Sequence, residues 1–531
     1  MSRSGSVTLR EFIGHAATSS RGVIADLARY HDPPMRLLLA GLVSVVVIAT
    51  STGVALSLGA GSTTDSEGAS ATVAGEPLLT AILDPDSLEG PEKDVAYEHV
   101  RRAGAQFVRM HVNWADVAPR GASKPSPFDA RNPSDPGYDW DRLDSQVKVA
   151  VAEGRTPIVY VQSAPIWAQL CSTGPGPCRP SPSALGEFMR AAALRFRGGY
   201  RGLPRVRYWQ IWNEPNLDSY LMPQYDAKGR PVSPLWYRSM VNAAADAIHS
   251  VRQDNMVIAG GQSPFGPDAK STGRTAPLTF MRKLLCLSEG RNPKRVCSQN
   301  ARFDVWAHHP YTSGGPTHHA TNPNDVSAPD LWKMRVLLDA AVRAGTLESR
   351  GPVAFWVTEF AWDTSPPDPK GVPEELHARW VAEVLYRMWD QGVSLVTWFL
   401  VRDQPFTDTT PFQAGLYFRG PNGIASDTPK MALTAFRFPF VAFREPKKKS
   451  VMYWGRSPAG RSTVIVEQKR QGSWRVVQTL RPNSYGIFSG RYASKAKAGF
   501  LRARLANGKD EALPFSLVVP PDRPGCAWGT C

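Results

Sequence analysis

Cysteine is scarce in this chain, and the motifs that usually accompany metal chemistry are missing. Six cysteines occur among 531 residues, none of them in a Cys-x-x-Cys pair, and no His-Glu-x-x-His motif is present. The adjacent histidines at 308–309 and 318–319 do not replace such a motif, because neighbours on a strand point to opposite faces and zinc usually takes three or four protein ligands. We therefore expect no metal site and no other cofactor.

Runs of like charge are also rare, although the chain carries a net charge of +15. The basic residues are scattered, residues 447–449 form the one basic run, and no nucleic-acid-binding motif accompanies them. We expect no nucleic-acid partner. A solvated surface is the plainer interpretation, although an exported protein could also use the charge to stay near anionic wall polymers or lipid headgroups.

Long apolar runs are missing except for one. Residues 37–58 contain no charged side chain and are long enough, at about 1.5 Å per residue, to cross a bilayer as a helix. Five arginines precede this run and no basic residue follows it until Lys93, so the positive-inside rule places the N-terminus in the cytoplasm. We predict a cytoplasmic segment at 1–36, a transmembrane signal-anchor helix at 37–58 and a flexible linker at 59–77. The rest would lie on the extracellular side of the cytoplasmic membrane, or be secreted if the signal is cleaved.

All six cysteines follow the apolar run, and their spacing groups them into three short-range pairs. The pairs are Cys171 with Cys178, Cys286 with Cys297, and Cys526 with Cys531. We predict three small-loop disulfides formed in an oxidising compartment. Free thiols or zinc ligands are the alternatives, but no histidine lies near the pairs in the sequence.

From residue 78 to residue 431, short β-branched or aromatic runs alternate with amphipathic segments, which is typical of βα units. Leu185, Phe188, Met189 and Ala192, for example, repeat at helical spacing. Eight such units predict a (β/α)8 TIM barrel, whose chemistry is built where the strands end. The expected strands are residues 78–83, 105–111, 156–161, 206–213, 255–261, 303–309, 353–359 and 394–400.

After residue 431 the pattern changes to brief strands without helices, separated by turn residues. Strands are expected at 451–454, 463–467, 474–480, 500–505 and 515–519. We predict a small β-sandwich accessory domain over residues 432–531. It would be a structural companion to the barrel or, alternatively, a carbohydrate-binding domain.

Two glutamates stand at the ends of expected barrel strands. Glu214, preceded by Asn213 and followed by Pro215, ends the fourth strand, and Glu359 ends the seventh. Strands four and seven face each other across a ring of eight. Two carboxylates at one cleft are the minimum equipment for cleaving a glycosidic bond, because one must protonate the leaving oxygen and the other must attack or stabilise the sugar carbon. An isolated Asn-Glu-Pro could instead be a simple turn, but its pairing with Glu359 favours the catalytic interpretation.

The segment Ile-Trp-Asn-Glu-Pro-Asn at 211–216 resembles the acid/base motif of clan A retaining glycoside hydrolases, especially family 39 and the cellulase-like family 5. In that clan the acid/base glutamate follows an asparagine at the end of strand four, and the nucleophile is a glutamate at the end of strand seven. The resemblance implies a retaining β-glycosidase that acts on an extracellular poly- or oligosaccharide, with Glu214 as acid/base and Glu359 as nucleophile. A transglycosylase using the same residues, or a non-catalytic glycan-binding wall-associated protein, are the alternatives.

The resemblance also implies substrate-binding residues, namely Arg109, Asn213, His309, Tyr311 and Trp398. Arg109 and Tyr311 would hold the nucleophile and keep it ionised, Asn213 would bond the sugar 2-hydroxyl, His309 would lie on the rim, and Trp398 would form the floor of the site. Structural ion pairs or core packing are the alternative roles.

Three further tryptophans are candidates for sugar platforms, because flat aromatic faces pack on pyranose rings. They are Trp114, Trp167 and Trp362, with core packing as the alternative in each case.

Overall fold

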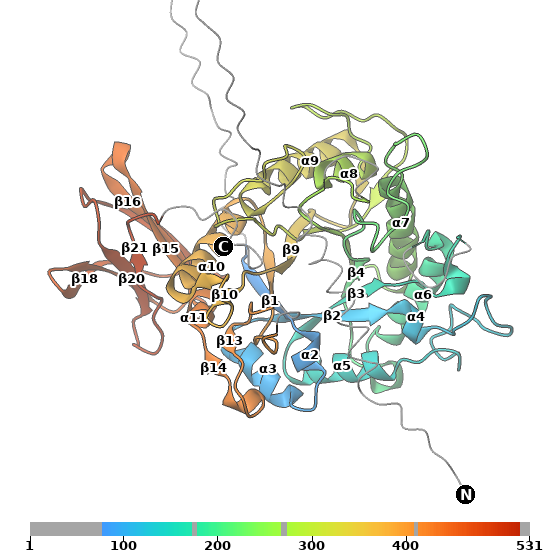
Figure 1. Ribbon diagram of the computed structural model, residues 1–531, viewed down its shortest axis with the longest axis horizontal. Coiled ribbons are helices and arrows are strands. Elements are labelled where there is room, and N and C mark those ends of the chain that lie inside the picture. The colour runs from blue at the N-terminus through green and yellow to red at the C-terminus, as the bar shows by residue number, and fades with distance from the viewer. Residues whose placement is uncertain (1–76, 172–177, 267–272, 408–411, 521–531) are drawn as a thin grey trace, which may run out of the picture. The chain divides into compact units, whose positions relative to one another are not determined.

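The computed structural model describes residues 77–171, 178–266, 273–407 and 412–520 (Figure 1). The predicted cytoplasmic segment, the predicted anchor at 37–58 and nearly all of the predicted linker lie outside these ranges. Within the ranges that are described, no helix combines the length and the hydropathy needed to cross a bilayer.

Eight parallel strands close into a barrel in the order β1-β12-β9-β7-β5-β4-β3-β2 (Figure 1). Every one of them overlaps a strand expected from the sequence, so the predicted barrel is confirmed. Counting barrel strands alone along the chain, β9 is the seventh and β12 the eighth. Their bounds are β1 Leu79–Leu83, β2 Phe107–Asn113, β3 Thr156–Gln162, β4 Tyr208–Ile211, β5 Met256–Gln262, β7 Val305–His308, β9 Ala354–Phe360 and β12 Leu395–Phe399.

The barrel interior is apolar at the amino ends of the strands and polar at the carboxyl ends. Phe107 of β2 and Ile158 of β3 belong to the buried apolar cluster inside the barrel. Because side chains alternate along a strand, Arg109 and Tyr160 share the inward face with them, two residues closer to the carboxyl ends. The apolar layer thus supports a polar layer at the barrel mouth.

Helices follow the strands and cover them, as the helical spacing predicted. Proline lies at the start of several of them, where its missing N–H costs nothing, and the Ser181 hydroxyl caps α6 by accepting a hydrogen bond from Ala184 N at 3.3 Å. The main helices are α3 Lys93–Arg102, α5 Asp141–Ala152, α6 Pro182–Arg195, α7 Ser233–Val251, α8 Pro277–Leu284, α9 Trp332–Ala344, α10 Glu374–Asp390 and α11 Met431–Arg437. The connections after β4, β7 and β12 are long.

The C-terminal part forms two antiparallel sheets, ordered β15-β16-β19 and β18-β17-β20-β21. Phe443 and Phe515, one from each sheet, pack edge to face with ring centroids 5.6 Å apart. The strands are β15 Phe440–Glu445, β16 Ser450–Arg456, β17 Val464–Arg470, β18 Ser473–Leu480, β19 Ile487–Ala493, β20 Phe500–Leu505 and β21 Phe515–Ser516.

Two of these strands, β15 and β19, were not expected from the sequence. Strand β19 contains Gly490, a residue that weakens a strand pattern. A side chain at this position would clash with the hydroxyl of Tyr453 on β16. The glycine is therefore required by packing between the neighbouring strands β16 and β19, which the strand propensity of a single segment does not reveal.

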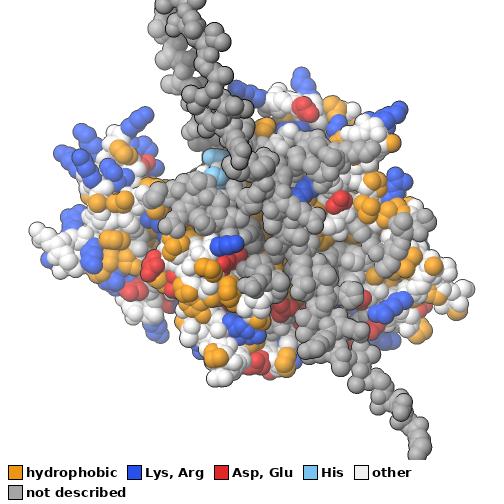
Figure 2. Space-filling model, viewed as in Figure 1, with side chains coloured by type: hydrophobic (Ala, Val, Ile, Leu, Met, Phe, Trp, Pro, Cys, Tyr) orange, Lys and Arg blue, Asp and Glu red, His pale blue; other side chains and the backbone are white. Residues whose placement is uncertain are grey.

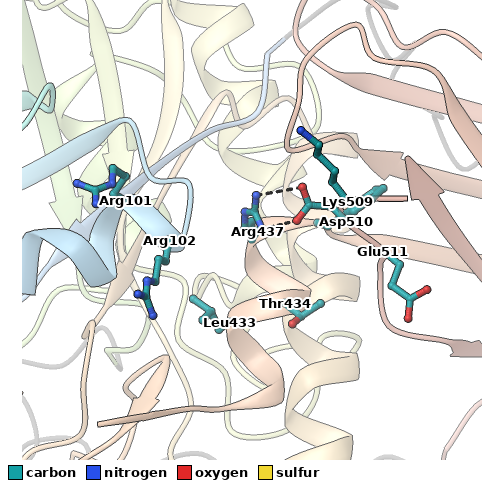
Figure 3. A pocket seen from close by; sticks show the side chains of 9 residues that line it. Arg101, Arg102, Leu433, Thr434, Arg437, Lys509, Asp510 and Glu511 are labelled. Atoms are coloured by element: carbon teal, nitrogen blue, oxygen red, sulfur yellow. Dashed lines mark hydrogen bonds and ion pairs between the residues drawn. The ribbon is translucent and has the colours of Figure 1, made fainter. Parts of the chain in front are cut away.

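Two arginine side chains, one of them buried, join the sheets to the amino end of the barrel. Arg456 of β16 donates hydrogen bonds to Leu78 O at 2.9 Å and to Phe436 O at 3.1 Å, and burial lowers its pKa to about 10. Beside it, Arg437 at the end of α11 forms an ion pair with Asp510 (Figure 3). This pair lines a cavity of about 470 Å³.

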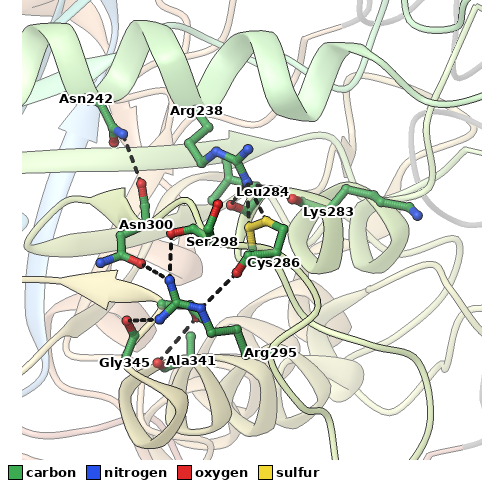
Figure 4. The surroundings of a disulfide bond; sticks show 12 residues. Arg238, Asn242, Lys283, Leu284, Cys286, Arg295, Ser298, Asn300, Ala341 and Gly345 are labelled. Carbon is green, nitrogen blue, oxygen red and sulfur yellow. Dashed lines mark hydrogen bonds between the residues drawn. A yellow bond between two sulfur atoms is a disulfide. The ribbon is translucent and has the colours of Figure 1, made fainter.

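Two of the three predicted disulfides are confirmed, Cys171–Cys178 and Cys286–Cys297, whereas residues 526 and 531 lie outside the described ranges. Around the second disulfide, Arg238 of α7 donates to Leu284 O at 3.1 Å and approaches Cys286 Sγ at 3.0 Å (Figure 4). Arg238 thus caps the end of α8 and holds the disulfide loop against α7.

Candidate active site

The chain turns sharply after β4, and Glu214 lies on this turn. Trp212 and Glu214 have φ angles of 69° and 39°, in the left-handed region that residues other than glycine rarely occupy. The turn is held by both neighbouring strands, because Trp212 N donates to Val161 O and Glu214 N to Gly261 O, each at 2.9 Å. Backbone strain of this kind persists only where the surroundings enforce it, and it often marks a functional position.

Glu359 lies near the carboxyl end of β9, and two donors fix both of its oxygens. Arg109 Nη1 lies 3.1 Å from Oε2, and the Tyr311 hydroxyl donates to Oε1 at 2.9 Å. The Glu359 side chain keeps 14% of its surface exposed, whereas the Arg109 side chain is fully buried. The carboxylate is therefore held rigidly and still reaches the opening of the barrel.

Arg109 also bonds to the strand that carries the other glutamate. Its Nε donates to Gln210 Oε1 at 3.1 Å, and Nη2 donates to Asn213 Oδ1 at 2.8 Å. Its guanidinium lies 3.9 Å from the centre of the Tyr160 ring, a cation–π contact that helps to hold it in place. One arginine thus links Glu359 to the residue that directly precedes Glu214.

His309 makes the reciprocal link, from Glu214 to the residue that precedes Glu359. Its Nδ1 lies 3.0 Å from Glu214 Oε1, and its Nε2 lies 3.1 Å from the hydroxyl of Thr358, the residue that directly precedes Glu359. Burial, followed by the charge of Arg109, lowers the pKa of His309 well below its ordinary value, so the imidazole is neutral. A neutral ring satisfies both contacts if Nδ1–H donates to Glu214 and Nε2 accepts from Thr358.

Room for the Gln210 amide beside this imidazole depends on a glycine. Gly261, at the end of β5, has a φ of 60°, and a Cβ there would lie 2.5 Å from the Gln210 amide and 3.5 Å from His309 Nε2. Only glycine fits this left-handed position without displacing Gln210.

Tyr220 and Tyr311 both lie within the electric field of Glu214 and of Glu359, as expected if the two carboxylates lie at the same end of the barrel. Burial raises the pKa of Tyr311 and of Tyr220 well above the ordinary value, and the negative charges of Glu214 and Glu359 both raise it further. Tyr220 belongs to the long loop after β4 and also hydrogen-bonds to Asn213. The predicted residues Arg109, Asn213, His309 and Tyr311 therefore come together around the two glutamates.

The electrostatics of Glu359 differ from the expectation in one respect. Arg109 and Tyr311 do favour its charged form, but burial is the largest effect and raises the pKa above the ordinary value for glutamate. The expectation considered the cation and the phenol without the cost of burying a carboxylate, which only the folded structure reveals.

Trp398 does not lie where the resemblance implied. Strand β12 pairs with β1 without interruption, and Leu395 belongs to the interior cluster, so alternation places Trp398 on the outer face of the strand. There its ring packs near His377 of α10 and Phe436 of α11, at 5.9 and 6.0 Å. The prediction that Trp398 forms the floor of the site is wrong, and Phe399 is the neighbour that shares the inward face.

Of the three tryptophans proposed as sugar platforms, two are buried in the core and one is half-buried. Trp114 and Trp362 are each at most 1% exposed, which makes them core residues and not sugar platforms. Trp167 is half-buried; its Nε1 donates to Pro119 O at 2.7 Å, and its ring lies edge to face with Phe128. None of the contacts described for Trp167 joins it to either glutamate, so a role in substrate binding remains a prediction.

Three positioning residues were missed from the sequence. Gln210 accepts from Arg109, Thr358 pairs with His309, and the Asn216 amide Nδ2 donates to Ser263 O at 3.0 Å, which ties the turn after β4 to the end of β5. Gln210 and Thr358 are polar residues inside apolar strand runs, and that pattern could have identified them.

The neighbouring histidine faces away from the site. His308 Nε2 lies 2.8 Å from Val326 O, and burial lowers the pKa of His308 to about 4. His308 and His309 thus point to opposite faces, as expected from their adjacency on a strand.

No family model matches this chain, and no curated protein matches it. Similar solved structures include a family 39 glycoside hydrolase from Bacteroides cellulosilyticus WH2, with 17% identity, a TM-score of 0.46 and coverage of 79% of each chain. A glucosidase from Croceicoccus marinus has 12% identity and a TM-score of 0.44 over 79% of this chain and 95% of that one. A GH5-4 broad specificity endoglucanase from Clostridium acetobutylicum has 15% identity and a TM-score of 0.39 over 64% and 91%. Both families named from the sequence are thus represented, but identities and TM-scores this low do not by themselves indicate a function.

Proposed function

We propose that this chain is a retaining β-glycosidase that hydrolyses a poly- or oligosaccharide. The observation that carries the proposal is the pair of reciprocal links between the glutamates, in which Arg109 joins Glu359 to Asn213 and His309 joins Glu214 to Thr358. Such links specify the relative position of two carboxylates, and that position is what glycosidase chemistry requires.

In the proposed reaction Glu359 attacks the anomeric carbon. Arg109 and the Tyr311 hydroxyl hold its two oxygens, so the attacking carboxylate has little freedom to rotate away from the sugar. As the bond to the sugar forms, the negative charge on Glu359 is lost. The raised pKa of Glu359 makes this loss of a buried charge less costly than it would be for an unperturbed carboxylate.

Glu214 is proposed to donate a proton to the departing oxygen and then to remove a proton from the incoming water. It enters the first step protonated and leaves it ionised, and the second step reverses this change. His309 suits such a group because the neutral imidazole can orient the carboxyl without adding a charge of its own.

The location of the reaction follows from the disulfides and from the predicted N-terminal anchor. Two disulfides fit an oxidising compartment, so we propose that the barrel works outside the cytoplasm. Whether it remains anchored through residues 37–58 or is released after cleavage is tested by the N-terminal sequence of the protein recovered from its native membrane or medium.

The proposal is tested by incubating the full chain with a panel of β-linked glycans and recording proton NMR spectra during the first turnovers. We expect the first anomer released to have the β configuration of the substrate. An inverted first product would contradict the retaining mechanism, and a lack of turnover on every glycan combined with measurable binding would favour a non-catalytic glycan-binding protein. Transfer of the sugar to added acceptors in preference to water would indicate a transglycosylase.

A further inference from the structure

The positive charge of this chain is concentrated in the two C-terminal sheets. Residues 440–520 contain sixteen Lys and Arg but four Asp and Glu, a net charge of +12, whereas the whole chain carries +15. The rest of the protein is therefore close to neutral. Figure 2 shows Lys and Arg side chains crowded over the region of β16 and its neighbours, at the left of the view.

Most of these cations are not neutralised within the protein. Four of them form ion pairs with Glu445 or Glu467, and Arg456 is buried. The other eleven are exposed and have no acidic partner among the residues that the structure describes. Unpaired like charges repel one another and destabilise a compact domain. An anionic partner that bound to these cations would offset the repulsion between them.

Six of the eleven unpaired cations lie in three segments of the chain. These segments are the tip between β15 and β16, the tip between β17 and β18, and the connection from β19 to β20. We name their residues the basic edge: Lys447, Lys449, Lys469, Arg470, Lys495 and Lys497.

Contacts connect the three segments of the basic edge. Ser494 N donates to Lys449 O at 2.9 Å, which joins the first tip to the connection. Strands β17 and β20 pair with Gln468 opposite Leu501, so the end of β17 at Lys469 and Arg470 lies beside the start of β20, where the connection ends.

A second basic region, the cavity between α3, α11 and the sheets, is unsuited to an anion. The cavity of about 470 Å³ is lined by Arg101, Arg102, Arg437 and Lys509, among others (Figure 3). Arg101 and Arg102 stand at the end of α3, and Arg437 stands at the end of α11, where helix dipoles disfavour a negative ligand. Arg437 is already paired with Asp510, so this cavity is part of the junction between sheets and barrel.

We propose that the basic edge binds a carboxylated linear polysaccharide and so holds the barrel on the glycan that it cleaves. The choice of a glycan rests on the proposed function of the barrel. A polymer with regularly spaced carboxylates can engage several dispersed cations at once, and attachment at a second site raises the effective concentration of the polymer at the barrel mouth.

Features of the basic edge favour a glycan over a lipid surface or a nucleic acid. The segments 447–449, 469–472 and 494–499 contain no large apolar side chain that could enter a bilayer. Next to the second tip lies the half-buried ring of Trp474, with the Arg502 guanidinium 4.4 Å and the Lys469 ammonium 5.9 Å from its centre. An aromatic ring beside cations suits a sugar ring that carries a carboxylate. The two disulfides fit a compartment in which nucleic acids are not the usual partner.

The experiment compares two triple variants of the full chain, both also carrying Glu359→Ala so that no substrate is consumed. One is Lys449→Gln, Arg470→Gln and Lys497→Gln, with one change in each segment. The matched control is Lys148→Gln, Lys228→Gln and Arg343→Gln, which removes three exposed cations from the barrel. Binding is measured over a series of salt concentrations to polygalacturonate, an α-linked polymer that serves only as a carboxylated probe of the edge, and to neutral dextran, phosphatidylglycerol vesicles and duplex DNA.

We expect the control to bind polygalacturonate, more weakly at higher salt, and the edge variant to bind it about tenfold less tightly or worse. Equal binding by the two variants, no binding to polygalacturonate, or tighter binding to vesicles or DNA would overturn the proposal. Binding is measured without turnover, so the two proposals can fail separately: if the wild-type chain cleaves no glycan but still binds polygalacturonate through its basic edge, the glycosidase function is refuted and the edge remains a glycan-binding site. The edge triple variant made without Glu359→Ala should hydrolyse short soluble glycosides at the wild-type rate.

Discussion

Arg109 Nη1 lies 3.1 Å from Oε2 of Glu359, and the arginine side chain that makes this contact has no exposed surface. A buried guanidinium with bonds to three different partners cannot move without breaking several of them, so it fixes the carboxylate in one place. The two residues are separated by 250 positions in the sequence. Their contact makes the carboxyl ends of β2, β4 and β9 one rigid unit, and the predictions that follow depend on it.

Replacing Glu359 by alanine should abolish hydrolysis, with a loss of roughly a thousandfold or more in kcat, because no group remains to form the covalent intermediate. Azide should restore turnover by occupying the vacated space, and the product should then have the inverted configuration. Glu375→Ala, which removes an exposed glutamate of α10, is the matched control. Undiminished hydrolysis by Glu359→Ala would remove the assignment of the nucleophile.

Replacing Glu214 by alanine should give a loss that depends on the leaving group. Substrates with activated phenol leaving groups need no proton and should still form the glycosyl-enzyme, whereas natural glycosides should not. The measurement is pre-steady-state release of phenol from a series of aryl glycosides with different leaving-group pKa values. A loss of equal size across the series would count against Glu214 as the acid.

The acid limb of the pH profile should lie above pH 4.5, because burial raises the pKa of Glu359 above that ordinary value and the nucleophile must be ionised. The Tyr311 hydroxyl bonds the carboxylate and lowers this pKa, so Tyr311→Phe should raise it and move the acid limb of kcat/KM to higher pH. Tyr485→Phe, at an exposed position, is the control. A shift to lower pH would show that the phenol does not stabilise the charged form.

The two aromatic residues at the end of β12 should respond differently to substitution by leucine. Trp398→Leu removes core packing against α10 and α11 and should lower the free energy of unfolding by about 3 kcal/mol while leaving KM nearly unchanged. Phe399→Leu conserves most of the buried volume but removes a flat ring from the inward face, and should raise KM several-fold at little cost in stability. Urea unfolding and steady-state kinetics separate the two effects. The reverse pattern would restore Trp398 as the floor of the site.

Arg456 should matter for stability and not for catalysis. Arg456→Met leaves the carbonyls of Leu78 and Phe436 without their donors and should lower the free energy of unfolding by about 3 kcal/mol. Urea unfolding of the full chain measures this change, with the exposed Arg461→Met as control. If the two variants unfold alike, Arg456 is not a principal link between the sheets and the barrel.

The sequence alone determined the number of barrel strands and the strand ends at which both glutamates lie. Each strand and helix buries one face, and this burial leaves a repeating pattern of apolar residues within a short stretch of sequence. Such a local pattern can be recognised without knowing the tertiary structure. For the same reason the short-range disulfides Cys171–Cys178 and Cys286–Cys297 could be predicted, since their partners are close along the chain.

Tertiary structure decided which side of a strand each aromatic residue occupies, which polar groups meet across the barrel, and how strongly burial acts on Glu359. Trp398 and Phe399 are adjacent in sequence and equally suited to bind a sugar, and only the register of β12 against β1 places one outside the barrel and the other inside. Gln210 and Thr358 acquire their roles from Arg109 and His309, which are distant in sequence. The alternation of residues along the chain gives a period but not the phase, because the phase depends on which neighbouring strand each residue pairs with.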